Sequence, residues 1–351
     1  MSLREVDGPP GAPWQRPMHG TLDQLLVESE LLADNPLGDP EVRPLWVYRP
    51  PGVELDHPRP LPSVYVIQGY TGQLDMWTRR EPFELTFIER LDAMFAAAEC
   101  PSAIVVLADC WTSYGGSQFV NSLATGPYQD HLCDEIVPFV DDRYPTAADR
   151  DHRGLTGKSS GGYGAMVVPM SRPDVFGALA SHAGDALFEC CYLPEFPEVA
   201  RVLRDHFEGS YEVFFARLAE QDHVDFQRFG KPLEAYGYAA CYSPDPARPG
   251  KALLPFDVAT GRLDDEVWVR WLEHDPVRMA ESHADALRSM RRIYLDAGRS
   301  DEYFLDLGAQ AFAAELDKLG VEHSLELFEG THAGLTYRYP GAIRELVTAL
   351  R

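Results

Sequence analysis

A serine flanked by glycines is the strongest chemical signal in this sequence. Residues Gly157-Lys158-Ser159-Ser160-Gly161 fit the pattern G-x-S-x-G and are followed by Gly162-Tyr163-Gly164. In such a pattern the serine occupies a tight turn from a strand into a helix, where glycines avoid the clashes that side chains would make. The hydroxyl of Ser159 would then project above a sheet as a nucleophile, and the amide of Ser160 would face the oxygen of a bound carbonyl group.

A serine becomes nucleophilic at neutral pH when a base and an orienting acid assist it. In α/β hydrolases these follow in the chain order serine, acid, histidine. His332 lies in a small-residue loop after the last expected strand, and Asp301 lies beyond Gly298 after the penultimate one. We therefore predict Asp301 as the acid and His332 as the base. Asp296, at the end of the penultimate strand, is the alternative acid, and we expect it to brace the loop instead.

A second donor to the carbonyl oxygen is expected in the loop after the strand at residues 64–67. That loop reads Gln68-Gly69-Tyr70-Thr71-Gly72, and we assign the donor to the backbone amide of Tyr70. Two amides directed at the developing negative charge would stabilise the transition state by several kcal/mol. The amides of Tyr70 and Ser160 are therefore the predicted oxyanion hole.

Three further side chains follow expected strands at the same edge of the sheet. Trp111 and Tyr114 come after residues 103–108, and His182 comes after residues 176–180. We predict that they border the substrate pocket, because ligands bind outside the carboxyl ends of parallel strands. Packing in the core or in a cap is the first interpretation for the aromatic residues Trp77, Trp111, Tyr114, Trp268 and Trp271, and the pocket is the sharper hypothesis for Trp111 and Tyr114.

Strand-like and helix-like patterns alternate along most of the chain. Apolar or β-branched runs predict strands at residues 45–48, 64–67, 103–108, 176–180, 293–295 and 325–328. Helical spacing of apolar residues falls between them, for example at residues 87–98 and 305–319. This alternation predicts the α/β class, with a mostly parallel central sheet and helices on both of its faces.

Two stretches depart from this alternation and divide the chain. Residues 1–40 are rich in proline and acidic residues, which predicts an extended N-terminal arm. Residues 186–285 carry helical patterns and aromatic residues, which predicts a helical cap or lid inserted over the sheet edge. The α/β core is then formed by residues 41–185 and 286–351.

Composition excludes several classes of partner. The chain has 351 residues, with 31 Lys and Arg against 55 Asp and Glu, a formal net charge of −24. That charge repels phosphate backbones and anionic membranes, so we expect no nucleic acid and no membrane as partner. Its strongest apolar run, residues 103–108, is shorter than the roughly 20 residues of a membrane span. The N-terminus lacks an apolar leader, which predicts a cytoplasmic protein.

Cofactor chemistry finds no support in the sequence. Gly157-Lys158-Ser159 resembles the end of a P-loop, but position 152 is His152, where that motif requires glycine. No clustered set of histidines and carboxylates has the spacing of a metal site. The six cysteines lack C-x-x-C spacing, so we expect reduced thiols. We predict no cofactor and no metal.

The sequence resembles the Putative esterase family of α/β hydrolases, which includes esterase D, enterochelin esterases, feruloyl esterases and mycolyltransferases. The likeness covers about residues 40–185 and 275–350 and is carried by the serine motif together with Gly69-Tyr70, Asn121-Ser122, Gly126-Pro127-Tyr128, Glu135-Ile136-Val137-Pro138 and Asp296-x-Gly298-x-x-Asp301. It implies an α/β-hydrolase fold and the same site residues assigned above. The sequence departs from the family at Gln68, where many relatives carry histidine, and at Lys158 and Ser160, where larger apolar residues are common.

These observations predict a serine esterase that acts on a small-molecule carboxylic ester or thioester through an acyl-enzyme. Acyl transfer to an alcohol and hydrolysis of siderophore lactones are alternatives that use the same three residues. A catalytically silent relative that binds a ligand is the alternative outside enzymes. The residue pattern assigns no oligomeric state.

Overall fold

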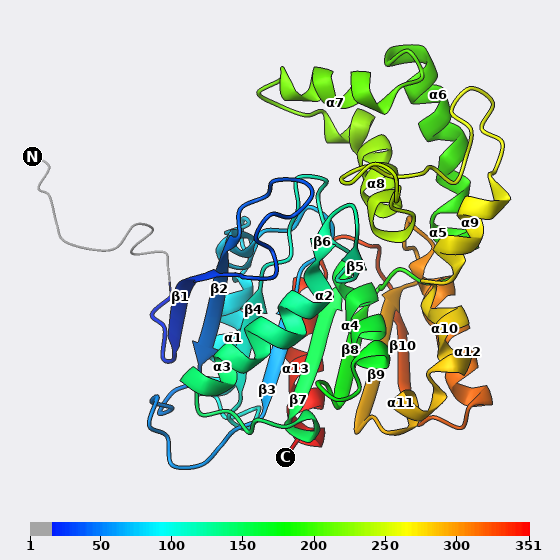
Figure 1. Ribbon diagram of the computed structural model, residues 1–351. Helices are drawn as coiled ribbons and strands as arrows, with labels where there is room; N and C mark the ends of the chain where they lie inside the picture. Colours follow the sequence, from blue (N-terminus) through cyan, green and yellow to red (C-terminus); the bar gives the residue numbers. More distant parts are fainter. Residues whose placement is uncertain (1–15) are drawn as a thin grey trace, which may run out of the picture.

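An eight-stranded sheet forms the centre of the computed structural model, which describes residues 16–351 (Figure 1). Its strands, in chain order, are β1 (Thr21–Glu28), β2 (Val42–Arg49), β3 (Ser63–Ile67), β4 (Ile104–Ala108), β7 (Arg153–Lys158), β8 (Ala178–His182), β9 (Arg292–Gly298) and β10 (Ser324–Phe328). The order across the sheet is β1-β2-β4-β3-β7-β8-β9-β10, and the six strands from β4 to β10 are parallel. The predicted α/β class and mostly parallel sheet are confirmed.

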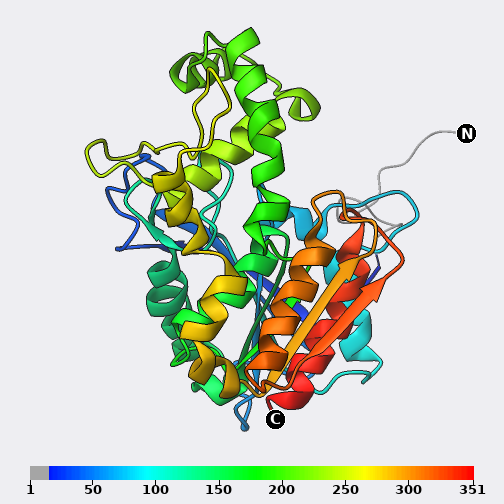
Figure 2. The same cartoon turned by 90° about the vertical axis from the view of Figure 1, so that its right-hand side faces the viewer.

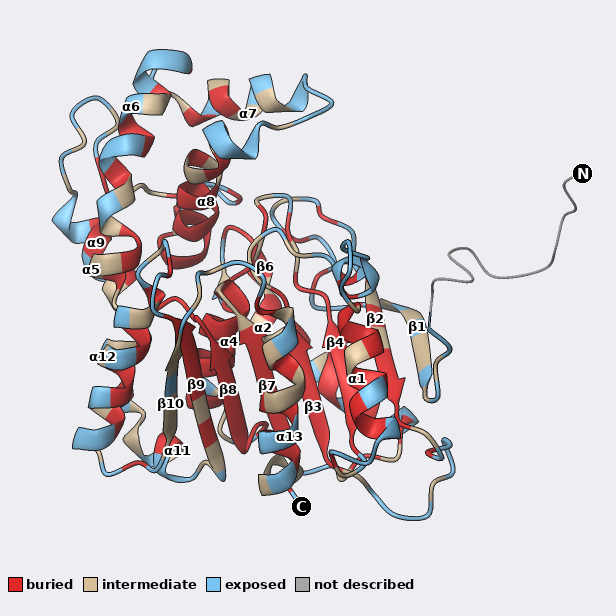
Figure 3. Cartoon of the chain, turned by 180° about the vertical axis from the view of Figure 1, so that it is seen from behind, coloured by how far each residue is buried: buried red, intermediate tan, exposed pale blue. Residues whose placement is uncertain are grey.

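The central strands are apolar along their whole length because both faces of the sheet are covered. In β3, Tyr65 and Ile67 enter one hydrophobic core, whereas Val64 and Val66 enter the other. Helices α1 (Phe87–Ala96) and α13 (Tyr339–Ala349) cover the second core and lie in front in Figure 3. The opposite face carries α2 (Tyr128–Asp130), α3 (Val137–Arg143), α4 (Ser160–Ser171) and α12 (Leu305–Lys318).

The chain between β8 and β9 is helical and rises over the carboxyl ends of the strands (Figure 2). It comprises α5 (Phe188–Cys191), α6 (Phe196–His206), α7 (Tyr211–Ala219), α8 (Phe226–Tyr242), α9 (Asp265–Leu272), α10 (Pro276–Ser282) and α11 (Ala284–Arg288). We call residues 188–272 the cap, because α10 and α11 pack beside the sheet against α12 and α4. Trp268 and Trp271 are buried in the cap, against Phe196.

The structure corrects the expectation of an arm over residues 1–40. Residues 21–28 form β1, an edge strand that pairs antiparallel with β2 in a continuous register from Thr21–Arg49 to Glu28–Val42. Leu25 and Val27 pack against the core, whereas Leu26 between them is exposed, which is the alternation of a half-covered strand. The first part of the expected arm, residues 1–15, lies outside the described residues.

A buried ion pair joins strands β2 and β4 near the loop that follows β3. Nη2 of Arg43 lies 2.5 Å from Oδ2 of Asp109, and both side chains are buried. Burial raises the pKa of Asp109, and the guanidinium of Arg43 opposes that rise. Gln68 donates from Nε2 to Oδ1 of the same carboxylate at 3.3 Å. The pair thereby connects three elements at the sheet edge.

Among the described residues, no helix combines the length and apolar character needed to cross a bilayer.

We predict that Arg43→Met lowers the free energy of unfolding by about 3–5 kcal/mol, because it leaves the carboxylate of Asp109 buried without its cation. The double variant Arg43→Met/Asp109→Leu should recover a large part of that loss, since it removes both charges. Chemical denaturation of the three proteins at pH 7 measures the effect. A loss below about 1 kcal/mol in the single variant would contradict a stabilising role for the pair.

Candidate active site

Ser159 lies in a strained turn between β7 and α4. Its backbone has φ 59° and ψ −127°, a conformation that residues other than glycine rarely adopt. The amide of Ser159 donates to the carbonyls of His182 (3.0 Å) and Ala183 (3.1 Å), which holds the turn against the end of β8. A Cβ atom at Gly157 would lie 2.7 Å, and one at Gly161 2.5 Å, from the carbonyl oxygen of Ile67. The turn therefore requires glycine at both positions.

The side chains of Ser159, His332 and Asp301 form one hydrogen-bonded row. Nε2 of His332 lies 3.1 Å from Oγ of Ser159, and Nδ1 of His332 lies 2.8 Å from Oδ2 of Asp301. The second oxygen of Asp301 accepts from the amide of Tyr303 at 2.9 Å. The structure thus brings together the three residues that the sequence predicted as nucleophile, base and acid, from the ends of β7, β9 and β10.

The loop that carries His332 is held from two sides. The amide of His332 donates to Oε2 of Glu302 at 2.9 Å, and the imidazole lies 4.9 Å from the ring of Tyr303, centroid to centroid. Because the acid side chain and these two contacts come from one segment, residues 301–303 fix both the position and the orientation of the imidazole.

The two backbone amides predicted to bind a carbonyl oxygen lie on either side of the turn. A Cβ atom at Gly69 would lie 3.1 Å from the carbonyl oxygen of Lys158 and 3.4 Å from Cβ of Ser159, so the loop before Tyr70 is in contact with the nucleophile. Ser160 is the first residue of α4, where helix amides lack intrahelical acceptors. Both amides therefore belong to segments that adjoin Ser159.

Tyr70 is anchored by its side chain to the cap and to the loop after β4. Its hydroxyl donates to the carbonyl of Tyr114 at 2.6 Å, and its ring lies 5.3 Å from the ring of Tyr238. Gly237 of α8 allows this contact, because a Cβ atom there would lie 2.7 Å from the carbonyl oxygen of Tyr114 and 3.0 Å from the Tyr70 hydroxyl. The cap and the Tyr70 loop are therefore packed as one unit.

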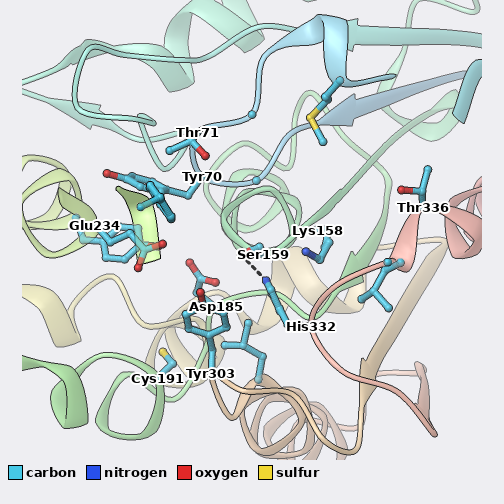
Figure 4. A pocket seen from close by; sticks show the side chains of 18 of the residues that line it. Tyr70, Thr71, Lys158, Ser159, Asp185, Cys191, Glu234, Tyr303, His332 and Thr336 are labelled. Atoms are coloured by element: carbon cyan, nitrogen blue, oxygen red, sulfur yellow. Dashed lines mark hydrogen bonds between the residues drawn. The ribbon is translucent and has the colours of Figure 1, made fainter. Parts of the chain in front are cut away.

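A pocket of about 300 Å³ opens beside Ser159 and His332, between the sheet edge and the cap. Figure 4 shows these two residues at its floor, with Lys158 on one side and Asp185 and Glu234 on the other. Burial lowers the pKa of the Lys158 ammonium, although the carboxylates of Asp301, Asp185 and Glu302 oppose that shift. Burial raises the pKa of Asp185, although Tyr192 and His332 oppose that rise. The pocket holds both signs of charge, on opposite sides of the nucleophile.

His182 does not border the pocket, contrary to the prediction. It is fully buried, its Nδ1 lies 2.7 Å from Oδ1 of Asp296, and its ring packs against Tyr339. Arg338 donates from Nε to the other oxygen of Asp296 at 2.7 Å. Burial alone would raise the pKa of Asp296, but His182 and Arg338 bring it below its usual range. Because Arg338 lies in the segment after His332, Asp296 braces that segment, whereas the sequence pattern suggested that it braces the loop of Asp301.

Trp111 and Tyr114 are likewise placed outside the pocket beside Ser159. The ring of Tyr114 turns toward the cap, where it lies 5.1 Å from the rings of Phe215 and Tyr236. Its hydroxyl donates to the carbonyl of Gly250 at 3.0 Å. Trp111 borders a separate small crevice that Gly69, Tyr70 and Ser160 also line. Neither residue lines the pocket, contrary to the prediction, and Tyr114 instead packs on the cap, whose position the sequence does not reveal.

Sequence reasoning missed the residues that the pocket takes from the cap and from the end of β8. Asp185 follows β8 directly, so its place after a parallel strand was a usable signal. Glu195 and Glu234 lie within helical patterns and carry no local motif. Aromatic side chains come from Tyr192, Phe226 and Tyr238 of the cap and from Tyr303. Within residues 16–351, no group of three or more histidines, cysteines and carboxylates could hold a metal ion.

Comparison with known proteins gives one family and many structures of the same fold. Residues 42–339 match the family described as Putative esterase. A ferulic acid esterase superposes with a TM-score of 0.59 at 17% sequence identity, covering 95% of this chain and 99% of that one. An S-formylglutathione hydrolase from Agrobacterium tumefaciens gives a TM-score of 0.57 at 14% identity, covering 96% and 98%.

One further solved structure and one curated protein also match this chain. A substrate-bound, fluorophosphonate-binding serine hydrolase from Staphylococcus aureus gives a TM-score of 0.57 at 15% identity, covering 95% of this chain and 99% of that one. Among curated proteins, an endo-1,4-beta-xylanase/feruloyl esterase from Xylanibacter ruminicola is 27% identical over 105 residues. That match covers 30% of this chain and only 14% of the relative. The chain therefore aligns with a small part of a much longer protein.

We predict that Gly237→Ala destabilises the protein, although alanine normally stabilises a helix by about 0.5–1 kcal/mol over glycine. The reason is that the added Cβ atom would press on the carbonyl of Tyr114 and on the Tyr70 hydroxyl. Gly230→Ala in the same helix is the matched control, since its Cβ atom would meet only the ring of Phe226, which is exposed and can turn. Thermal unfolding should show a lower Tm for Gly237→Ala than for Gly230→Ala. Equal values would contradict the tight packing of the cap on Tyr70.

Proposed function

The chain belongs to the Putative esterase family, and from that premise we propose that it is a serine hydrolase that cleaves a carboxylic ester or thioester through an acyl-enzyme. The observation that carries the proposal is the hydrogen-bonded row from Asp301 through His332 to Ser159, which opens into the pocket. The fold neighbours add support, because they include a ferulic acid esterase and an S-formylglutathione hydrolase. Their names describe ester and thioester substrates of those proteins.

In the first half of the reaction, Oγ of Ser159 attacks the carbonyl carbon while Nε2 of His332 accepts the hydroxyl proton. The amides of Tyr70 and Ser160 donate to the oxyanion of the tetrahedral intermediate. The intermediate then collapses: the bond from the carbonyl carbon to the leaving oxygen or sulfur breaks, and His332 donates its proton to the leaving group. Ser159 is left acylated, and the alcohol or thiol departs.

In the second half, water takes the place of the leaving group. His332 accepts a proton from water as its oxygen attacks the acyl carbon, and the same two amides receive the oxyanion. When the bond to Oγ breaks, His332 returns the proton to Ser159 and the carboxylic acid is released. Asp301 stays ionised throughout, holds Nδ1 of the imidazole as a donor, and stabilises the imidazolium that forms twice in the cycle.

Ser159→Ala should lower kcat/KM for p-nitrophenyl acetate by about four orders of magnitude or more, since no other group forms the acyl-enzyme. The Tm should change by no more than a few degrees, because Ser159 is partly exposed and the substitution removes a single oxygen atom. Stopped-flow release of p-nitrophenol, compared between the two purified proteins, measures the rates. A variant that keeps a tenth of the activity would refute the proposal.

Asp296 and Asp301, at and after the end of β9, should differ in the effect of replacement by asparagine. Asp301→Asn removes the acceptor for Nδ1 of His332, so kcat should fall roughly 10⁴-fold. Asp296→Asn should lower the free energy of unfolding by about 3–5 kcal/mol, because His182 and Arg338 lose a buried partner, and should lower kcat much less. Rates and denaturation curves of both variants distinguish the roles. The opposite pattern would assign the acid to Asp296.

A further inference from the structure

The wall of the pocket beneath the cap is acidic and aromatic. Three carboxylates line it, from three different segments: Asp185 after β8, Glu195 at the start of α6 and Glu234 in α8. Figure 4 shows Asp185 and Glu234 on the same side of Ser159, with Tyr70 and Tyr303 close by. Carboxylates and aromatic rings in one cavity are the groups that bind organic cations in proteins.

Glu234 is the carboxylate that most clearly lacks a partner. Its side chain lines the pocket, yet the residue is only 8% exposed. Within residues 16–351, no hydrogen bond or ion pair engages that carboxylate. Its neighbour in α8, Lys231, instead binds Glu198 at 2.5 Å and lies 3.8 Å from Glu195. A buried carboxylate without a cation or hydrogen-bond donor is costly, so this position is suited to a charge that arrives with a ligand.

The other carboxylates add to the negative potential at this wall. Asp185 accepts from the hydroxyl of Tyr192 at 2.7 Å and from Nε2 of Gln118 at 3.2 Å, neither of which carries a positive charge. Among the residues that the structure describes, the one ion pair of Glu195 is the 3.8 Å contact with Lys231, which Glu198 shares. One lysine at the rim therefore faces three carboxylates inside or beside the pocket.

Lys158 is the other cation of the pocket, and it does not neutralise this wall. It lies across Ser159 from Glu234 in Figure 4, and among the described residues it has no ion pair within 4.0 Å. A basic side chain and acidic side chains therefore lie on opposite sides of the nucleophile. A positive group on a substrate is attracted to the side of Glu234 and is repelled from the side of Lys158, which gives the bound ester a preferred direction.

We propose that the ester recognised at this site carries a primary ammonium group, which binds to Glu234 with Glu195 and Asp185 as its acidic surroundings. The inference rests on the proposed function, because it places that ammonium group on the substrate of Ser159. The ring faces of Tyr70 and Tyr238 would add cation–π attraction beside the carboxylates.

The pKa values of the carboxylates in the pocket predict how the preference for the ammonium ester depends on pH. Burial, together with the carboxylates of Glu195 and Asp185, raises the pKa of Glu234 to about 8, although Lys231 opposes that rise. Burial likewise raises the pKa of Glu195 to about 7. In the empty pocket at neutral pH, Glu234 is therefore largely protonated. An ammonium group binds the ionised form better, so the preference for it should grow as pH rises from about 6 to 9, below the ordinary pKa of an amine near 10.4.

The test compares two esters that differ only in charge. In p-nitrophenyl 6-aminohexanoate the chain ends in an ammonium group, and in p-nitrophenyl heptanoate a methyl group takes its place. At pH 8 we expect kcat/KM to favour the ammonium ester by roughly tenfold or more, as for a hydrogen-bonded charge pair. Dividing one kcat/KM by the other cancels the pH dependence of the catalytic steps that both reactions share. Equal values, or a preference for heptanoate, would overturn the inference.

Two substitutions assign that preference to the pocket. Glu234→Gln should bring the ratio of kcat/KM for the ammonium ester to kcat/KM for the heptanoate close to 1. Glu195→Gln should lower that ratio by a smaller amount. Glu198→Gln is the matched control, because it removes the same charge from a neighbouring side chain that is 57% exposed and lies outside the pocket. Thermal unfolding of each variant, compared with that of the wild-type protein, shows that it is folded. A ratio that survives Glu234→Gln, or that falls equally in Glu198→Gln, would contradict the proposed site.

Binding to the Ser159→Ala variant separates this inference from the proposed function. Calorimetry would compare 6-aminohexanamide with heptanamide, which need no hydrolysis. We expect a Kd at least tenfold lower for the ammonium compound, and loss of that difference in Ser159→Ala/Glu234→Gln. If that binding is seen while the wild-type protein hydrolyses neither ester, the ammonium site stands and the esterase proposal fails. If both esters are hydrolysed equally and neither amide is preferred, the esterase proposal stands and this inference fails.

Discussion

The close approach of two backbone segments is the constraint on which the rest of this site depends. The turn at Ser159 touches the end of β3, and at both Gly157 and Gly161 a side chain would collide with the carbonyl of Ile67. That contact sets the nucleophile against the loop whose amide, at Tyr70, is proposed to receive the oxyanion. It also holds Ser159 in a backbone conformation that only a tightly packed surrounding can maintain.

A parallel sheet brings the remaining groups to the same place. Strands β7, β8, β9 and β10 end at one edge, so residues that are distant in sequence meet there: Ser159, Asp185, Asp301 and His332. The cap then completes the pocket with carboxylates and rings that the sheet does not provide. The chemistry is thus a property of the sheet edge, whereas the charged groups of the pocket come both from that edge, with Lys158 and Asp185, and from the cap, with Glu195 and Glu234.

The chain order of short motifs was enough to predict the reacting groups. Ser159 lies in a glycine-flanked motif and His332 follows an expected strand, and the carboxyl ends of parallel strands converge at one edge of the sheet. Side-chain direction was not predictable in the same way. Tyr114 follows a strand at the correct edge but turns toward cap helices, and Glu234 lies in an ordinary helical pattern. Both depend on contacts between segments that are far apart in sequence, which local patterns do not encode.

The central claim is that Ser159 is chemically activated by its neighbours. Incubation of the protein and of Ser159→Ala with a fluorophosphonate probe, followed by intact mass measurement and peptide mapping, tests it most directly. The account predicts one adduct per chain, located on Ser159 and absent from the variant. Folded protein that forms no adduct, or an adduct that persists in Ser159→Ala, would contradict it.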